Sequence, residues 1–162
     1  MFERDIISQL AAWKTDTNRK PLVVHGARQV GKTWTLKYFG REYFDDVAYF
    51  SLDKDESGLC DVFRTTKDPQ RIIQHLSFLH GKKIEPQTTL LILDEIQECN
   101  EALNALKYFC EEAPEYAVAC AGSLLGIYLN HVGKSFPVGK VNHLYMYPLT
   151  FTEFLRTKDP VM

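Results

Sequence analysis

The chain has 162 residues, enough for one domain with a sizeable core, and it is 45% hydrophobic and 25% charged, as is typical of a soluble globular protein. Its formal net charge is −2 with acids and bases interspersed, so no broad basic field indicates a nucleic-acid partner. The longest apolar runs are far too short to span a bilayer and the N-terminus lacks a secretory hydrophobic segment, so we expect a cytoplasmic protein without a membrane partner.

The first part of the chain predicts two helices and two strands. Apolar residues recur at helical spacing over residues 2–13, and a polar turn at 15–18 ends this helix. Residues 21–25 predict a buried strand, and residues 32–39 predict a helix that ends at Gly40. A second strand is expected over residues 47–52.

The remainder alternates between helices and strands in the same way. A weak helix is expected at 60–64, and a better one begins with Asp68 as N-cap and Pro69 in its first turn and runs to Gly81. Residues 89–94 predict the third strand, and Asn100 is expected to cap a helix that ends before Pro114. The other expected elements are a strand at 117–121, a short helix at 124–131, a loop at 133–139, a strand at 141–147 and a helix from 151 to 156. This alternation predicts a parallel sheet with helices on both faces and a ligand site at the carboxyl ends of its strands.

The four cysteines show no C-x-x-C pairing and no companion histidines at zinc spacing. We therefore expect free thiols in a reducing cytosol, without a metal site, at Cys60, Cys99, Cys110 and Cys120.

A glycine-rich loop follows the first predicted strand and fits the pattern G-x-x-x-x-G-K-[ST] through Gly26, Gly31, Lys32 and Thr33. Glycines let successive backbone N–H groups turn toward a phosphate, and the helix that begins here directs its positive end at the same anion. Lys32 would reach the β- and γ-phosphate oxygens, and the hydroxyl of Thr33 would bind Mg²⁺. The pattern therefore predicts a nucleotide-binding P-loop.

Two acids, Asp94 and Glu95, end the apolar third strand. Such a strand, buried on both faces, opens into the site at its carboxyl end. Asp94 would hold Mg²⁺ directly or through water, and Glu95 would orient and polarise the attacking water.

Further candidates follow from their places along the chain. Ser123, directly after the fourth strand, is a candidate sensor of the γ-phosphate, with a strand-end turn as the alternative. Gln97 would either help to position water or solvate the strand end. His25 is expected to be a packed or hydrogen-bonded strand residue rather than an acid–base group. Trp13 would either brace the adenine or cover the core.

The segments GARQVGKT, LILDEIQ, AGS and SFPVGKV…YPLTFTEFL, in this order, resemble the N-terminal ATPase domain of a prokaryotic AAA-fold P-loop ATPase family. The resemblance covers nearly the whole chain and implies a three-layer α/β/α sandwich with a parallel sheet of about five strands in the order 5-1-4-3-2. It also implies ATP and Mg²⁺ as cofactors. The catalytic residues would be Glu95, Lys32 and Ser123, and Thr33 and Asp94 would be the metal ligands. The nucleotide would contact Gly26, Ala27, Arg28, Gln29, Val30, Gly31, Lys32, Thr33 and Trp34, with Arg28 and Gln29 shaping the loop.

Members of this family usually carry a further C-terminal domain, so residues 1–162 are expected to be an AAA-type ATPase domain of a longer protein, without the helical lid. Lys140 stands where the family usually has arginine; lysine keeps the charge and loses the bidentate fork. The sequence offers no clear charge-neutralising arginine, since Arg156 lies beyond the last strand, so we expect one from a lid or from a neighbouring subunit on self-association.

The resemblance favours ATP hydrolysis that moves the C-terminal domain. The alternative is a nucleotide-dependent interaction module with negligible hydrolysis, against which Glu95 argues because a pure binder needs no acid to activate water. A small-molecule kinase is disfavoured by the adjacent acids, and a GTPase by the lack of an N-K-x-D motif.

Overall fold

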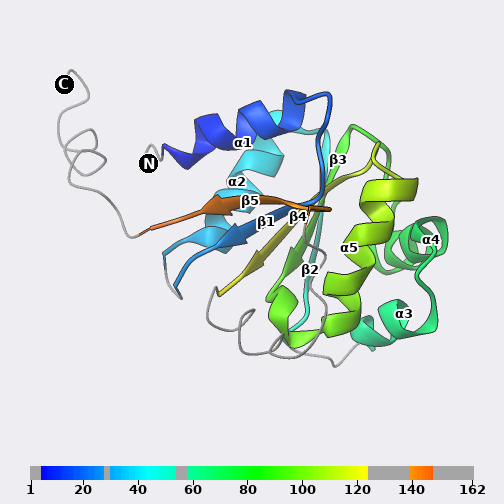
Figure 1. The fold of residues 1–162 in the computed structure, drawn as a ribbon. Helices are drawn as coiled ribbons and strands as arrows, with labels where there is room; N and C mark the ends of the chain where they lie inside the picture. Colours follow the sequence, from blue (N-terminus) through cyan, green and yellow to red (C-terminus); the bar gives the residue numbers. More distant parts are fainter. Residues whose placement is uncertain (1–4, 28–29, 54–57, 124–138, 148–162) are drawn as a thin grey trace, which may run out of the picture.

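The strands form one parallel sheet between two layers of helices (Figure 1). The computed structural model describes residues 5–27, 30–53, 58–123 and 139–147. Its strands are β1 (Leu22–His25), β2 (Asp46–Ser51), β3 (Thr89–Asp94), β4 (Ala117–Gly122) and β5 (Asn142–Tyr145). Read from β5, the strand order is 5-1-4-3-2, which confirms the prediction. Because all four strand pairs are parallel, the carboxyl ends meet at one edge of the sheet.

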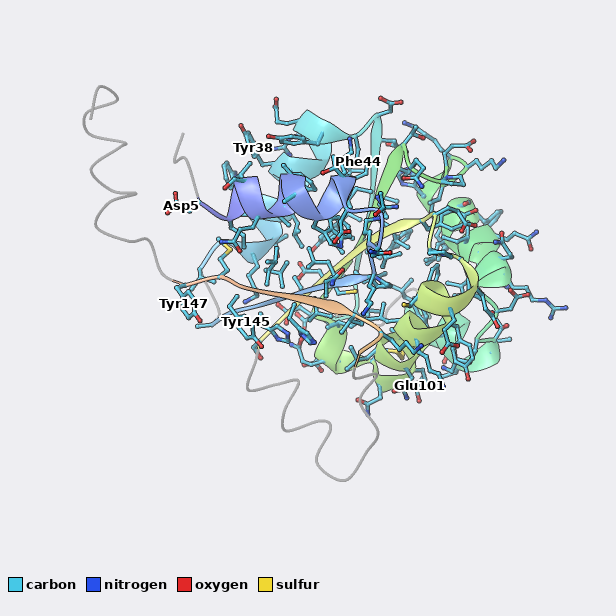
Figure 2. The ribbon with its side chains drawn as sticks, turned by 45° about the horizontal axis from the view of Figure 1, so that its top comes forward. Asp5, Tyr38, Phe44, Glu101, Tyr145 and Tyr147 are labelled. Carbon is cyan, nitrogen blue, oxygen red and sulfur yellow. A yellow bond between two sulfur atoms is a disulfide. The ribbon has the colours of Figure 1, made fainter. Side chains whose placement is uncertain are left out.

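Helices α1 (Ile6–Thr15) and α2 (Lys32–Tyr43) cover one face, and α3 (Leu59–Thr65), α4 (Pro69–His80) and α5 (Asn100–Glu112) cover the other (Figure 1). Figure 2 shows Tyr38 and Phe44 beside α1 and α2, and Glu101 on the opposite side.

Alternating strand residues supply two separate cores, one on each face of the sheet. On β3, Leu90 and Ile92 pack toward α1 and α2, whereas Leu91 and Leu93 pack toward α3, α4 and α5. A strand buried on both faces needs apolar side chains at every position, which explains the continuous apolar run that the sequence shows.

Helix α2 continues past Gly40, so the predicted end of this helix at the glycine is wrong. Gly40 lies buried inside the helix because it allows close packing against the sheet. A Cβ at this position would lie 2.5 Å from Cγ2 of Val47 and 3.2 Å from Cδ2 of Leu90. The glycine therefore serves the helix–sheet contact and not helix termination.

The ends of the next helices agree only partly with the prediction. Asp68 caps α4 as expected, since its carboxylate accepts a hydrogen bond from the backbone N–H of Gln70 at 3.0 Å. Asn100 does not cap α5; Cys99 occupies that position without a side-chain cap, and Asn100 is the first helical residue. A short 3₁₀ helix that was not predicted, η2 (Ile96–Glu98), joins β3 to α5. The helices expected at 124–131 and 151–156 lie outside the described residues.

Cys60 of α3 and Cys99 before α5 form a disulfide, so the prediction of free thiols is wrong for this pair. The two cysteines are 39 residues apart in the sequence, and their pairing follows from the packing of α3 against α5 rather than from a local motif. Cys110 and Cys120 are free, as predicted. Among the described residues no helix has the length and apolarity that a membrane crossing requires.

Candidate nucleotide-binding site

The loop between β1 and α2 is shaped by its two glycines for different reasons. At Gly26 a Cβ would lie 2.5 Å from the carbonyl oxygen of Met146, so only glycine fits against the chain that follows β5. Gly31 has φ of +89°, a left-handed conformation that glycine adopts readily, and it immediately precedes α2. Gly26 therefore lets the loop lie close to the chain that follows β5, and Gly31 turns the loop into the helix.

Lys32 brings a buried positive charge into this loop. The residue is only 8% exposed, and its ammonium donates 2.8 Å hydrogen bonds to the carbonyl oxygens of Gly26 and Ala27. The first backbone N–H groups of α2 lie at the same place, since α2 begins at Lys32. An ammonium and helix N-terminal N–H groups are the kinds of group that bind an anion.

Other predicted loop residues differ in their surroundings. Val30 is buried in the core beneath α1 and α2. Trp34 is 47% exposed and stacks on Tyr38 with ring centroids 5.3 Å apart. Arg28 and Gln29 lie outside the described residues.

Asp94 joins the loop to the end of β3. Its Oδ2 accepts hydrogen bonds from Thr33 Oγ1 at 2.7 Å and from the hydroxyl of Tyr49 at 2.6 Å, and its Oδ1 accepts one from the backbone N–H of Glu95 at 2.9 Å. Asp94 is buried, with only 5% of the residue exposed. The structure therefore brings together the predicted metal ligands Thr33 and Asp94, and oxygen donors of this kind suit Mg²⁺.

Tyr49, on β2, is a site residue that sequence reasoning missed. Burial and the hydrogen bond to Asp94 raise the pKa of its hydroxyl, which therefore stays protonated and remains a donor. The sequence feature that could have identified Tyr49 is its polar hydroxyl in a strand otherwise rich in apolar residues.

Glu95 has a left-handed backbone, with φ of 52°. A residue with a Cβ adopts this conformation at a cost of about 1 to 3 kcal/mol, and such strain clusters at functional sites. The carboxylate of Glu95 accepts a hydrogen bond from the Gln97 amide at 2.5 Å. Gln97 is buried and contacts the predicted water-activating acid directly.

Ser123 lies directly after β4, half-buried at the same edge of the sheet. Because β4 pairs with both β1 and β3, Ser123 follows the strand between the P-loop strand and the acidic strand. The topology thus places all three strand ends side by side.

His25 is a packed and hydrogen-bonded residue, as predicted. Its Nε2 lies 2.8 Å from Nδ1 of His143, and its ring stacks on those of His143 and Tyr145. Burial, with smaller effects of His143 and Lys32, lowers the pKa of His25 to about 4. The imidazole is therefore neutral at physiological pH.

Two further candidates lie away from the loop. Trp13 is buried in the core, and its indole N–H donates to the carbonyl of Lys20, which supports its core-covering role. Lys140 lies before the amino end of β5, at the edge opposite the P-loop, and forms an ion pair with Glu111 at 3.1 Å. Arg156 lies outside the described residues.

A parallel sheet of order 5-1-4-3-2, with a glycine-rich loop after its first strand, defines a P-loop domain of the AAA type. A family model described as an AAA domain matches residues 18–155, and the chain belongs to this family. Membership of this family supports the general conclusion that the chain binds nucleotide and has an ATPase-type activity.

No curated protein is matched by the sequence. Among solved structures, C. elegans PCH-2 aligns with a TM-score of 0.47 and 13% sequence identity, over 87% of this chain and 41% of that chain. The chain thus spans less than half the length of PCH-2.

Proposed function

We propose that this domain binds ATP with Mg²⁺ and hydrolyses it, and that this cycle drives a conformational change in an attached C-terminal domain. The observation that carries the proposal is the 2.7 Å hydrogen bond from Thr33 to Asp94. It joins the last residue of the phosphate-binding loop to the acid at the end of β3, which is the arrangement that a metal bound to phosphate oxygens requires.

Each residue then has a defined role. Lys32 exchanges its two loop carbonyls for the β- and γ-phosphate oxygens, and backbone N–H groups of the loop bind the same phosphates. Thr33 and Asp94 hold Mg²⁺, which neutralises phosphate charge when bound. Glu95 takes a proton from the attacking water, Ser123 contacts the γ-phosphate, and Trp34 offers an exposed ring beside the nucleotide.

The second candidate is an interaction module that binds ATP and hydrolyses it negligibly. It is favoured by the hydrogen bond from Gln97 to the Glu95 carboxylate, because an oxygen engaged in this way is a weaker acceptor for the proton of water. Hydrolysis then depends on release of Glu95 from Gln97, or on a group from a neighbouring subunit.

Two substitutions test the proposal. Lys32→Ala should abolish the rise in melting temperature that Mg·ATP causes in the wild type, because the loop loses its buried cation. Glu95→Gln should keep that rise and slow phosphate release by roughly a hundredfold or more, as expected for loss of a positioned base. The measurements are thermal shift and phosphate release over a range of protein concentrations, the latter reporting self-association.

Matched controls are Lys107→Ala, on the exposed side of α5, and Glu98→Gln, exposed three residues after Glu95. Both should behave as wild type. Unchanged ATP binding in Lys32→Ala would refute the nucleotide site. Hydrolysis by Glu95→Gln at the wild-type rate would assign water activation to another group, and negligible hydrolysis by the wild type would favour the interaction module.

A further inference from the structure

Tyr49 contacts the Asp94 carboxylate from a strand that carries no part of the predicted site. We propose that Tyr49 is a positioning residue of the metal site, whose hydroxyl fixes the orientation of the Asp94 carboxylate for Mg²⁺. The inference rests on the proposed function, because it assigns a role in the same Mg²⁺ site.

The hydroxyl reaches Asp94 because of the register between β2 and β3. Tyr49 pairs with Ile92, two residues before Asp94, and alternation along β3 directs Ile92 and Asp94 to the same face of the sheet. The Tyr49 side chain packs on this face and extends along β3, so that its oxygen lies 2.6 Å from Asp94 Oδ2. Such a short distance is typical of a hydroxyl that donates to a charged carboxylate.

Helix α2 also contacts the ring of Tyr49, through Lys37. The ammonium of Lys37 lies 3.9 Å from the ring centroid, in the geometry of a cation–π contact. Lys37 follows Thr33 by one helical turn, so both residues project from the same side of α2. The position of the hydroxyl is therefore set by two elements, β2 and α2, and not by the strand alone.

The consequence lies in the geometry of the metal ligand. A carboxylate has about four lone-pair positions, and three hydrogen bonds already occupy the Asp94 carboxylate: those from Thr33, Tyr49 and the Glu95 backbone. Rotation of the carboxylate would break all three. Mg²⁺ demands near-ideal octahedral geometry, so a carboxylate that is held in one orientation binds it better than one that rotates.

The test uses Tyr49→Phe, which removes the hydroxyl and keeps the ring that Lys37 contacts. A fluorescent ATP analogue is titrated into the protein in EDTA and then at increasing Mg²⁺ concentration. We expect Tyr49→Phe to need a roughly tenfold higher Mg²⁺ concentration for the half-maximal effect on analogue binding, as is usual for loss of a hydrogen-bond partner of a metal ligand. Binding in EDTA should stay unchanged, and the melting temperature should fall by at most a few degrees.

The matched control is Tyr43→Phe, which should keep the wild-type Mg²⁺ requirement. Tyr43 is the last residue of α2 and is 41% exposed. A second measurement makes the result independent of a general loss of stability: in an Asp94→Asn background, Tyr49→Phe should cause no further change in the Mg²⁺ requirement. An additional loss there would show that Tyr49 acts through the fold and would overturn the inference.

An unchanged Mg²⁺ requirement in Tyr49→Phe would also overturn it, and a lower one would show that the hydroxyl competes with the metal. In both cases Mg²⁺-dependent binding by the wild type leaves the proposed function standing. If the wild type binds the analogue without any effect of Mg²⁺, the proposed function and this inference fail together.

Discussion

Among single residues, His25 couples the P-loop strand to β5, because its imidazole is hydrogen-bonded to His143. Burial and, to a smaller extent, the charges of His143 and Lys32 lower its pKa. Its pKa in the folded protein is about 4, below the ordinary value of 6.5. The unfolded chain therefore binds more protons than the folded one between these two pH values. The stabilisation from a neutral His25 is complete above pH 6.5 and is lost as the pH falls toward 4.

We predict that His25→Gln flattens the pH dependence of unfolding in this range. The number of protons taken up on unfolding near pH 5 should fall by up to about one, because glutamine does not titrate. Denaturant unfolding measured from pH 4 to 7 would show this as a shallower slope of the unfolding free energy. His75→Gln, on the exposed side of α4, is the matched control. Equal slopes in the wild type and His25→Gln would contradict the lowered pKa.

At the scale of elements, the packing of α2 on the sheet depends on the close approach that Gly40 permits. Gly40→Ala adds a methyl group 2.5 Å from Val47 Cγ2, which neither element accommodates without a shift. Alanine gains about 1 kcal/mol in helix propensity, whereas overpacking costs about 1 to 3 kcal/mol, so we predict a net loss of about 1 kcal/mol in the free energy of unfolding. Denaturant unfolding would measure it.

The partner in this contact supplies the control. Val47→Ala removes the atom that the new methyl group would meet, so Gly40→Ala should cost less in the Val47→Ala background than in the wild type. If the two substitutions are simply additive, the close approach at Gly40 does not limit the packing of α2.

At the scale of the whole molecule, the Cys60–Cys99 disulfide links α3 to the turn that follows Asp94 and Glu95. It closes a loop between cysteines separated by 39 residues in the sequence, which includes α4 and β3. Cross-links of this span stabilise a fold by about 2 to 4 kcal/mol, chiefly by restricting the unfolded chain. We therefore predict that reductant lowers the melting temperature of the wild type.

The Cys60→Ser/Cys99→Ser double variant should be less stable than the oxidised wild type by about the same 2 to 4 kcal/mol and should not respond to reductant. Cys110→Ser, which removes a free thiol, should keep the response. The unfolded, unreduced wild type should titrate as two thiols, Cys110 and Cys120. Four titrating thiols, or a melting temperature that is insensitive to reductant, would contradict the disulfide.

The sequence by itself determined those features that depend on neighbours along the chain. These features are the glycine turn before α2, the adjacent residues Lys32 and Thr33, the acids at the end of β3 and the cap at Asp68. Each arises within a few residues, where spacing and residue type constrain the backbone directly. The strand order came from the family resemblance, since alternating strands and helices predict a parallel sheet without fixing the order of its strands.

The tertiary structure alone decided the contacts between elements. Tyr49 reaches Asp94 only through the register of β2 against β3, and Gly40 lies inside α2 because Val47 and Leu90 approach it from the sheet. Cys60 meets Cys99 only once α3 packs beside α5. Local sequence patterns do not predict such distances, because the distances depend on how the side chains of separate elements fill a shared core.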